Sequence, residues 1–203
     1  MLAYDRPPGL AVRRRAAPRR PPEVRPLSHT WSRLLVEQLD FYWQAHLWPR
    51  LTGLTDSEYA WEPAPRSASV RRGPDGTHAL EEAPPGGVPT IAWRLAHIGA
   101  HNLATRAATF FGENPSGADM FDPRHVPVLP GGAAGALDLL ESSFRRWQGG
   151  VAGLDDARLA APVGPLGGPY ADEPMAALVL HVARETMHHG GEICLLRDLY
   201  AAR

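Results

Sequence analysis

The chain has 203 residues, of which 44% are hydrophobic and 21% charged, and its formal net charge is −1. This length and balance predict one ordinary globular domain, and they exclude an overall charge bias toward nucleic acid or anionic membranes. The single cysteine, Cys194, excludes an internal disulfide framework and a cysteine-based zinc finger, and the lack of a long apolar run or a secretory signal predicts a cytoplasmic protein without a membrane span.

Residues 1–26 have the composition of a disordered tail, with six Pro, seven Arg and no periodic apolar pattern. The seven Arg against Asp5 and Glu23 give a local charge of +5, which leaves −6 for residues 27–203. A nucleic-acid-binding arm is one interpretation of such a tail, but a plain solvated extension is favoured because Tyr4 is its only aromatic residue. The charge of the remaining domain disfavours nucleic acid as its partner.

Two helices are predicted in the first half of residues 27–203. The first runs from an N-cap at Ser28 or Thr30 to about Leu51, and Pro49 is expected to kink or end it. The second starts after Thr90 as N-cap and ends at Gly112.

Two further helices are predicted in the second half. The third begins after Gly131–Gly132 and keeps a strict three-four apolar spacing to Leu154, and the fourth runs from about residue 172 to 200 with Pro174 near its first turn. The connections at 62–89, 113–131 and 161–171 are dense in Pro and Gly, and no segment shows sustained period-two alternation, so no strands are predicted. This pattern predicts an all-α four-helix bundle whose long first loop crosses over its end.

The last predicted helix carries the strongest functional signal. One stripe of it is apolar at both ends and holds Glu185 and His189, four residues apart, in the middle. A carboxylate that faces a core is costly unless something compensates its charge. A metal ion bound by Glu185 and His189 is the economical compensation.

The second helix offers a third ligand. Its most apolar stripe contains His97, whereas His101 lies on a more polar neighbouring stripe. A core histidine satisfied by a backbone carbonyl is the commoner reading of an isolated case, but His97, Glu185 and His189 together resemble the metal sites of helix bundles. Two imidazoles and one carboxylate suit Zn²⁺, Ni²⁺, Mn²⁺ or Fe²⁺ and leave a coordination position open.

Other polar residues are weaker candidates. His181 and His188 could orient a ligand, although a solvated flank is the commoner outcome, and His46 is an alternative ligand. Glu192 is expected in a surface ion pair of little energetic weight, and Cys194 in a structural role.

Three segments resemble the DinB-like superfamily, in particular its actinobacterial members: Leu51-Thr-Gly-Leu-Thr-Asp-Ser-Glu-Tyr-Ala-Trp-Glu-Pro, Thr90-Ile-Ala-Trp-Arg-Leu-Ala-His-Ile and Glu185-Thr-Met-His-His-Gly-Gly-Glu-Ile-Cys-Leu-Leu-Arg-Asp-Leu-Tyr. The resemblance implies a four-helix bundle with a divalent metal ion held by one residue of helix two and two of helix four, which are His97, Glu185 and His189 here. Many members have His where this chain has Glu185, and residues 67–71 also depart from the family pattern.

The resemblance implies a metal-dependent transferase that joins a low-molecular-weight thiol, such as mycothiol or bacillithiol, to a small electrophile. A metal hydrolase is the alternative, with His101, His181 or His188 as general base. A non-catalytic metal-binding stress-response module is a further alternative. A homodimer is expected from the same resemblance.

Overall fold

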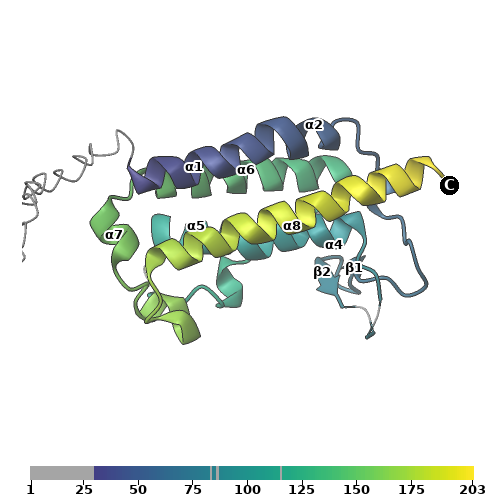
Figure 1. Cartoon of the computed structure of the whole chain (residues 1–203). Coiled ribbons are helices and arrows are strands. Elements are labelled where there is room, and N and C mark those ends of the chain that lie inside the picture. The colour runs from purple at the N-terminus through teal and green to yellow at the C-terminus, as the bar shows by residue number, and fades with distance from the viewer. Residues whose placement is uncertain (1–29, 83, 86, 115) are drawn as a thin grey trace, which may run out of the picture.

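A computed structural model of the chain describes residues 30–82, 84–85, 87–114 and 116–203. The predicted tail and the alternative N-cap Ser28 lie outside these residues. The described part is predominantly helical, which confirms the all-α class, and Figure 1 shows its long helices lying side by side. None of the helices described is long and apolar enough to cross a membrane.

The first long helical stretch consists of α1 (Trp31–Tyr42), the π-helical η1 (Trp43–Leu47) and α2 (Trp48–Leu51). Thr30 caps it, because its side-chain oxygen accepts a hydrogen bond from the Arg33 amide at 3.4 Å. The helix continues through Pro49 and ends two residues later. The Trp48 amide donates to the Trp43 carbonyl, five residues back, so the chain is already in π register when it reaches the proline.

The second stretch consists of α4 (Ile91–Ala96), the π-helical η2 (His97–Ala104) and α5 (Thr105–Phe111). Thr90 caps it by accepting from the Trp93 amide at 3.1 Å, and Gly112 follows its last residue, as predicted. The π segment begins at His97. Such segments often lie at functional sites.

The remaining long helices are α6 (Ala133–Ala152) and α8 (Met175–Ala201), which agree with the predicted third and fourth helices. Both α6 and α8 contact α1 on one side and η2 on the other. The first and second stretches therefore share the same two packing partners. The short elements α3 (Asp56–Tyr59), η3 (Pro123–His125), α7 (Asp156–Ala160) and η4 (Pro165–Tyr170) lie in the connections.

The expectation of no strands is wrong at one place. Strands β1 (Ser69–Arg72) and β2 (His78–Glu81) form an antiparallel hairpin. Four residues are too few to show a period-two pattern, which is why the alternation was not visible. The available signal was the turn between the strands, where Gly76 adopts φ +84° after Asp75 and the Asp75 side chain accepts from the Thr77 amide at 3.0 Å.

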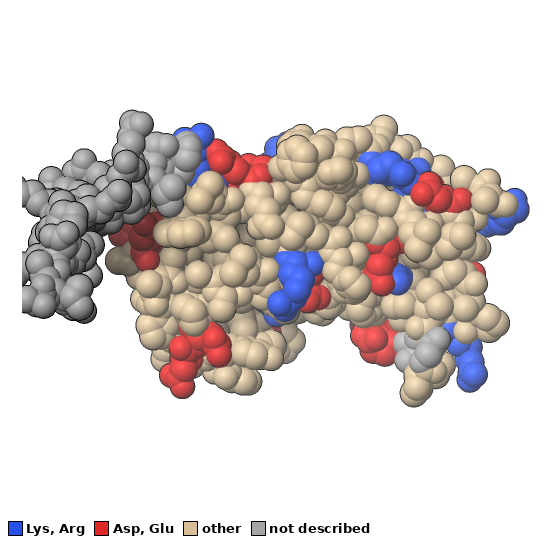
Figure 2. Space-filling view, viewed as in Figure 1, with Lys and Arg blue, Asp and Glu red and all other residues tan. Residues whose placement is uncertain are grey.

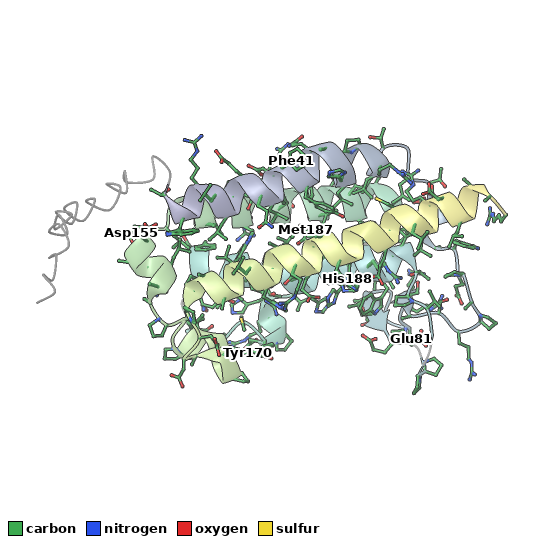
Figure 3. The ribbon with its side chains drawn as sticks, in the orientation of Figure 1. Phe41, Glu81, Asp155, Tyr170, Met187 and His188 are labelled. Carbon is green, nitrogen blue, oxygen red and sulfur yellow. The ribbon has the colours of Figure 1, made fainter. Side chains whose placement is uncertain are left out.

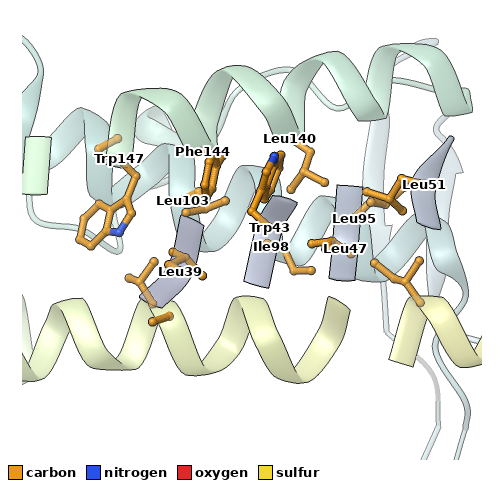
Figure 4. Packing of buried hydrophobic residues seen from close by; sticks show 14 of the residues in the cluster. Leu39, Trp43, Leu47, Leu51, Leu95, Ile98, Leu103, Leu140, Phe144 and Trp147 are labelled. Carbon is orange, nitrogen blue, oxygen red and sulfur yellow. The ribbon is translucent and has the colours of Figure 1, made fainter. Parts of the chain in front are cut away.

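Aromatic side chains centre the core between the helices. The Trp43 and Phe144 rings are stacked with their centroids 3.8 Å apart, and Figure 4 shows them among leucines from the first, second and third stretches. Trp147, one turn of α6 further on, is fully buried. On the molecular surface, Figure 2 shows acidic and basic side chains interspersed over the face in view, without a large patch of one sign.

A buried ion pair fixes the C-terminal half of α8 to the segment after α2. Arg197 contacts Glu58 with Nε and Oε1 2.5 Å apart, and it also donates to the carbonyls of Arg50 and Thr52. Glu58 is only 6% exposed, so loss of its partner would leave an uncompensated charge. The next residue, Asp198, forms a second ion pair with Arg50 at 2.5 Å, so two adjacent residues of α8 contact the segment from α2 to α3.

Gly190 lets α8 approach α1 and η1 closely. A Cβ at Gly190 would lie 2.5 Å from the Tyr42 hydroxyl oxygen and 3.2 Å from Leu47 methyl carbons. That hydroxyl donates to the Met187 carbonyl at 3.1 Å, so it is not free to move away. The neighbouring Gly191 is exposed, and a Cβ there would have no atom within 4 Å.

We expect Gly190→Ala to lower the free energy of unfolding by about 1–3 kcal/mol, because it overpacks this contact. Gly191→Ala is the matched control. It should raise stability by up to ~1 kcal/mol through helix propensity alone. Urea unfolding of both variants checks the pair, and equal effects at the two positions would contradict the close-approach explanation.

Candidate metal centre

Three side chains from two helical stretches converge between η2 and α8. The Glu185 Oε2 atom lies 3.7 Å from His97 Nε2 and 3.6 Å from His189 Nε2. One donor atom from each residue lies within 4.8 Å of the other two. The structure therefore brings together the three residues selected from the sequence.

The spacing and chemistry of this cluster fit a divalent metal ion. Two ligands about 2.1 Å from an ion and at a tetrahedral angle lie roughly 3.4 Å apart. The two distances to Glu185 are within a few tenths of an ångström of that value. The side chains are 15–30% exposed rather than fully buried, which leaves the cluster accessible from solvent.

A hydrogen bond fixes the orientation and tautomer of His189. Its Nδ1 lies 2.6 Å from Glu192 Oε2, and a carboxylate can only accept, so Nδ1 carries the hydrogen. The lone pair of the neutral ring is then on Nε2, the atom that faces Glu185. This is the arrangement by which carboxylates orient metal-binding histidines.

Arg94 in turn holds Glu192. Its Nε donates to Glu192 Oε2 at 2.8 Å, and Arg94 is only 5% exposed. Although burial raises the pKa of Glu192, the hydrogen bonds from Arg94 and His189 outweigh it and the net pKa is lowered. Glu192 is thus a half-buried anion between two helices, and the expectation of a weak surface pair is wrong. The signal in the sequence was the spacing of Glu192 three residues after His189, because residues three apart lie on the same face of a helix.

His97 is held against Trp93 and kept neutral. The two rings stack with centroids 4.8 Å apart and an interplanar angle of 7°. Burial is the main cause that lowers the pKa of His97 to about 4, assisted by His189 and opposed by Glu185. At neutral pH the imidazole is therefore in the form that a metal ligand requires.

Beside the cluster, the π-helical segment η2 contacts both α8 and α6. Asn102 donates from Nδ2 to the Val182 carbonyl on α8 at 3.3 Å. On the other side a Cβ at Gly99 would lie 3.3 Å from the Leu140 Cα, so η2 packs closely on α6. These contacts set the distance between His97 and the α8 residues.

The other predicted histidines take different places. His181 is half-buried, and its Nδ1 lies 2.7 Å from an Arg184 guanidinium nitrogen and 3.8 Å from Glu185 Oε1. His101 is half-buried outside the cluster, and burial lowers its pKa. His188 is exposed and lies 3.7 Å from Glu192, in a second group of possible donors that shares His189.

His46 does not belong to the site. It is exposed on η1 and packs on the rings of Phe41 and Tyr42, so its reading as an alternative ligand is wrong. A 3.6-residue period placed it inward, whereas η1 has a wider turn. Cys194 is half-buried, and burial raises the pKa of its thiol.

A cavity of about 420 Å³ adjoins the cluster through His181. It lies between the first half of α8, α5, η4 and the segment around Phe121. Tyr170, one of its lining residues, is labelled in Figure 3. Its volume is in the range of small-molecule sites.

Comparison with known proteins gives one family. The family described as the DinB superfamily matches residues 38–193, which include the whole donor cluster. Searches of curated proteins and of solved structures gave no match.

The low pKa of His97 predicts a pH dependence of the metal-free protein. The folded-state pKa of about 4 is below the ordinary 6.5, so the unfolded chain binds this proton more readily. Stability should be fully present above pH 6.5 and fall as the pH decreases toward 4. Urea unfolding in the presence of a chelator should show a shallower fall for His97→Gln. The exposed His46→Gln variant should keep the wild-type slope, and an unchanged slope in His97→Gln would contradict the assignment.

Proposed function

Because the chain belongs to the DinB superfamily, we propose that it is a divalent-metal-dependent enzyme that transfers a low-molecular-weight thiol to a small electrophile. His97, Glu185 and His189 would hold the metal ion, and Zn²⁺, Ni²⁺, Mn²⁺ and Fe²⁺ are the candidates for this donor set. Mycothiol and bacillithiol are the candidate thiols.

One observation carries the proposal. Three donor atoms of suitable type lie within 4.8 Å of one another, and the ring of His189 is already oriented by Glu192. If Glu185, His97 and His189 were simply solvated side chains, the hydrogen bonds from Arg94 to Glu192 and from His189 to Glu192 would have no evident purpose. Three protein ligands leave a position for water or substrate, as in catalytic rather than structural sites.

When bound, a divalent ion with an open position supplies Lewis acidity that lowers the pKa of a thiol below its usual value of about 8.5. In the transfer, the thiolate sulfur forms a bond to an electrophilic carbon while the bond to the leaving group breaks. The leaving group takes that electron pair, and the thiol proton passes to solvent or to a nearby histidine.

His181 is the candidate histidine that lines the cavity. Arg184 donates to its Nδ1, so the neutral ring carries its hydrogen on Nε2 and can donate it to a leaving group or a carbonyl oxygen. Burial lowers the pKa of His181, although Glu185 opposes this, which favours the neutral ring at pH 7. His101 and His188 remain candidates for accepting the thiol proton.

The adjoining cavity favours an enzyme over a non-catalytic metal-binding module, because a structural metal needs no space beside it. A hydrolase is the remaining catalytic alternative, since the same cluster could serve to activate water. On the face drawn in Figure 2, acidic and basic side chains are interspersed, and this face gives no support to nucleic-acid binding. A homodimer is proposed from the family resemblance, and a cytoplasmic location from the lack of a secretory signal and a membrane span in the sequence.

Metal binding tests the cluster. We expect about one divalent ion per chain in wild-type protein and loss of that ion in His189→Ala. Glu192→Gln should weaken metal affinity by about 10–100-fold, because it replaces the charged acceptor that orients His189 with a neutral and weaker one. His46→Gln should leave affinity unchanged. Competition titration with a chromophoric chelator measures all four, and stoichiometric, tight binding by His189→Ala would contradict the assignment.

Conjugation tests the reaction class. Metal-loaded protein should accelerate the reaction of mycothiol or bacillithiol with monochlorobimane, and His189→Ala should reduce the rate at least ~100-fold because the metal site is lost. Hydrolysis of an activated ester without added thiol, together with no thiol-dependent conjugation, would replace the transferase by the hydrolase. Neither activity in metal-loaded protein would favour a non-catalytic module.

A further inference from the structure

The cavity beside the metal cluster contains an arginine that no carboxylate of the described residues contacts, although Glu185 lies near enough to act on its pKa. Arg106 on α5 lines the cavity, and its Nη1 donates to the His101 carbonyl and to the Thr105 hydroxyl at 2.9 Å. Its Nε is buried without a hydrogen-bond partner. Among the residues the structure describes, no carboxylate pairs with this guanidinium within 4.0 Å. The guanidinium therefore carries a charge that no described carboxylate contacts, on a side chain that lines an open cavity, where an anion from outside the chain could pair with it.

The charges around the cavity suit a monoanion. Arg106 and Arg184 line it together with one acid, Glu173, so the lining carries a net charge of about +1 when His181 is neutral. Arg184 is exposed and already engaged, because it donates to His181 and its Nε lies 3.7 Å from Glu185 Oε1. Arg106 is therefore the group with donors to spare, and a carboxylate matches the fork of a guanidinium.

The rest of the lining suits an apolar or aromatic body. Met120, Phe121, Tyr170 and Leu178 contribute apolar surface, and the Arg106 guanidinium carbon lies 5.7 Å from the Phe121 ring centroid. A planar group could therefore pack beside Phe121 while its acid reaches Arg106. His181 also lines the cavity, and its Nδ1 is 3.8 Å from Glu185 Oε1.

We propose that this cavity binds an organic monocarboxylic acid with an apolar or aromatic body, with its carboxylate on Arg106 and its body beside Phe121. This inference deepens the proposed function, because it names the class of electrophile that the thiol would attack. Arg106 acts here as a specificity-determining residue that binds substrate.

Binding of a simple acid to metal-free protein tests the cavity separately from the metal. Calorimetric titration with 3-phenylpropionate, in the presence of a chelator, should give a Kd at least ~10-fold lower than titration with the uncharged 3-phenylpropanol. Arg106→Met should remove this preference, and Arg106→Lys should keep part of it through its charge. Arg145→Met removes an exposed arginine that pairs with Glu141 and should behave as wild type.

Each outcome decides one point. Equal affinity for the acid and the alcohol in wild-type protein would overturn the proposal, even if Arg106→Met failed to fold. Inorganic phosphate that displaces the acid at similar concentration would replace it with a simple anion site. If the protein prefers the acid but binds no metal ion, the cavity proposal is supported and the metal proposal fails. If it binds a metal ion but does not prefer the acid, the metal proposal is supported and the cavity proposal fails.

Discussion

The hydrogen-bonded chain from Arg94 through Glu192 to His189 connects the second and fourth helical stretches at the level of the donor cluster. It spans two helices that have no covalent connection nearby, and each link depends on the one before it. Without Arg94, the half-buried Glu192 would lose its charge partner. Without Glu192, nothing would select the His189 tautomer that directs Nε2 toward Glu185. The geometry of the cluster is thus a property of helix packing as much as of its three donors.

The cluster combines partial burial with access, and both are needed for chemistry. Burial keeps His97 neutral and Trp93 holds its ring in place. The remaining exposure allows an ion and a substrate to reach the donors. The closely packed aromatic centre around Trp43 and Phe144 lies elsewhere between the helices, so the fold does not rely on the cluster for its main apolar core.

Periodicity was sufficient to predict the long helices and which three side chains would meet between two of them, because helix caps and apolar stripes are local features. Thr90 and Gly112 bounded the second stretch, and the spacing of Glu185 and His189 selected one face of α8. The errors have physical causes: the hairpin strands are too short to alternate visibly, and the π turn displaced His46 from the expected face. The position of Arg106 could not be predicted, because it depends on how α5, η4 and α8 pack.

The length of the π-helical η2 determines how His97, at its start, and Arg106, just after its end, are oriented relative to each other. In a regular α-helix, residues nine apart point about 180° away from each other, yet His97 meets Glu185 and Arg106 shares a cavity with His181, both on α8. A π segment holds extra residues per turn and so rotates everything after it relative to everything before it. Loss of one residue from this segment would turn Arg106 away from α8 without altering any side chain of the donor cluster. An insertion or deletion in η2 would therefore change which ligand the cavity accepts while metal binding by the cluster is retained.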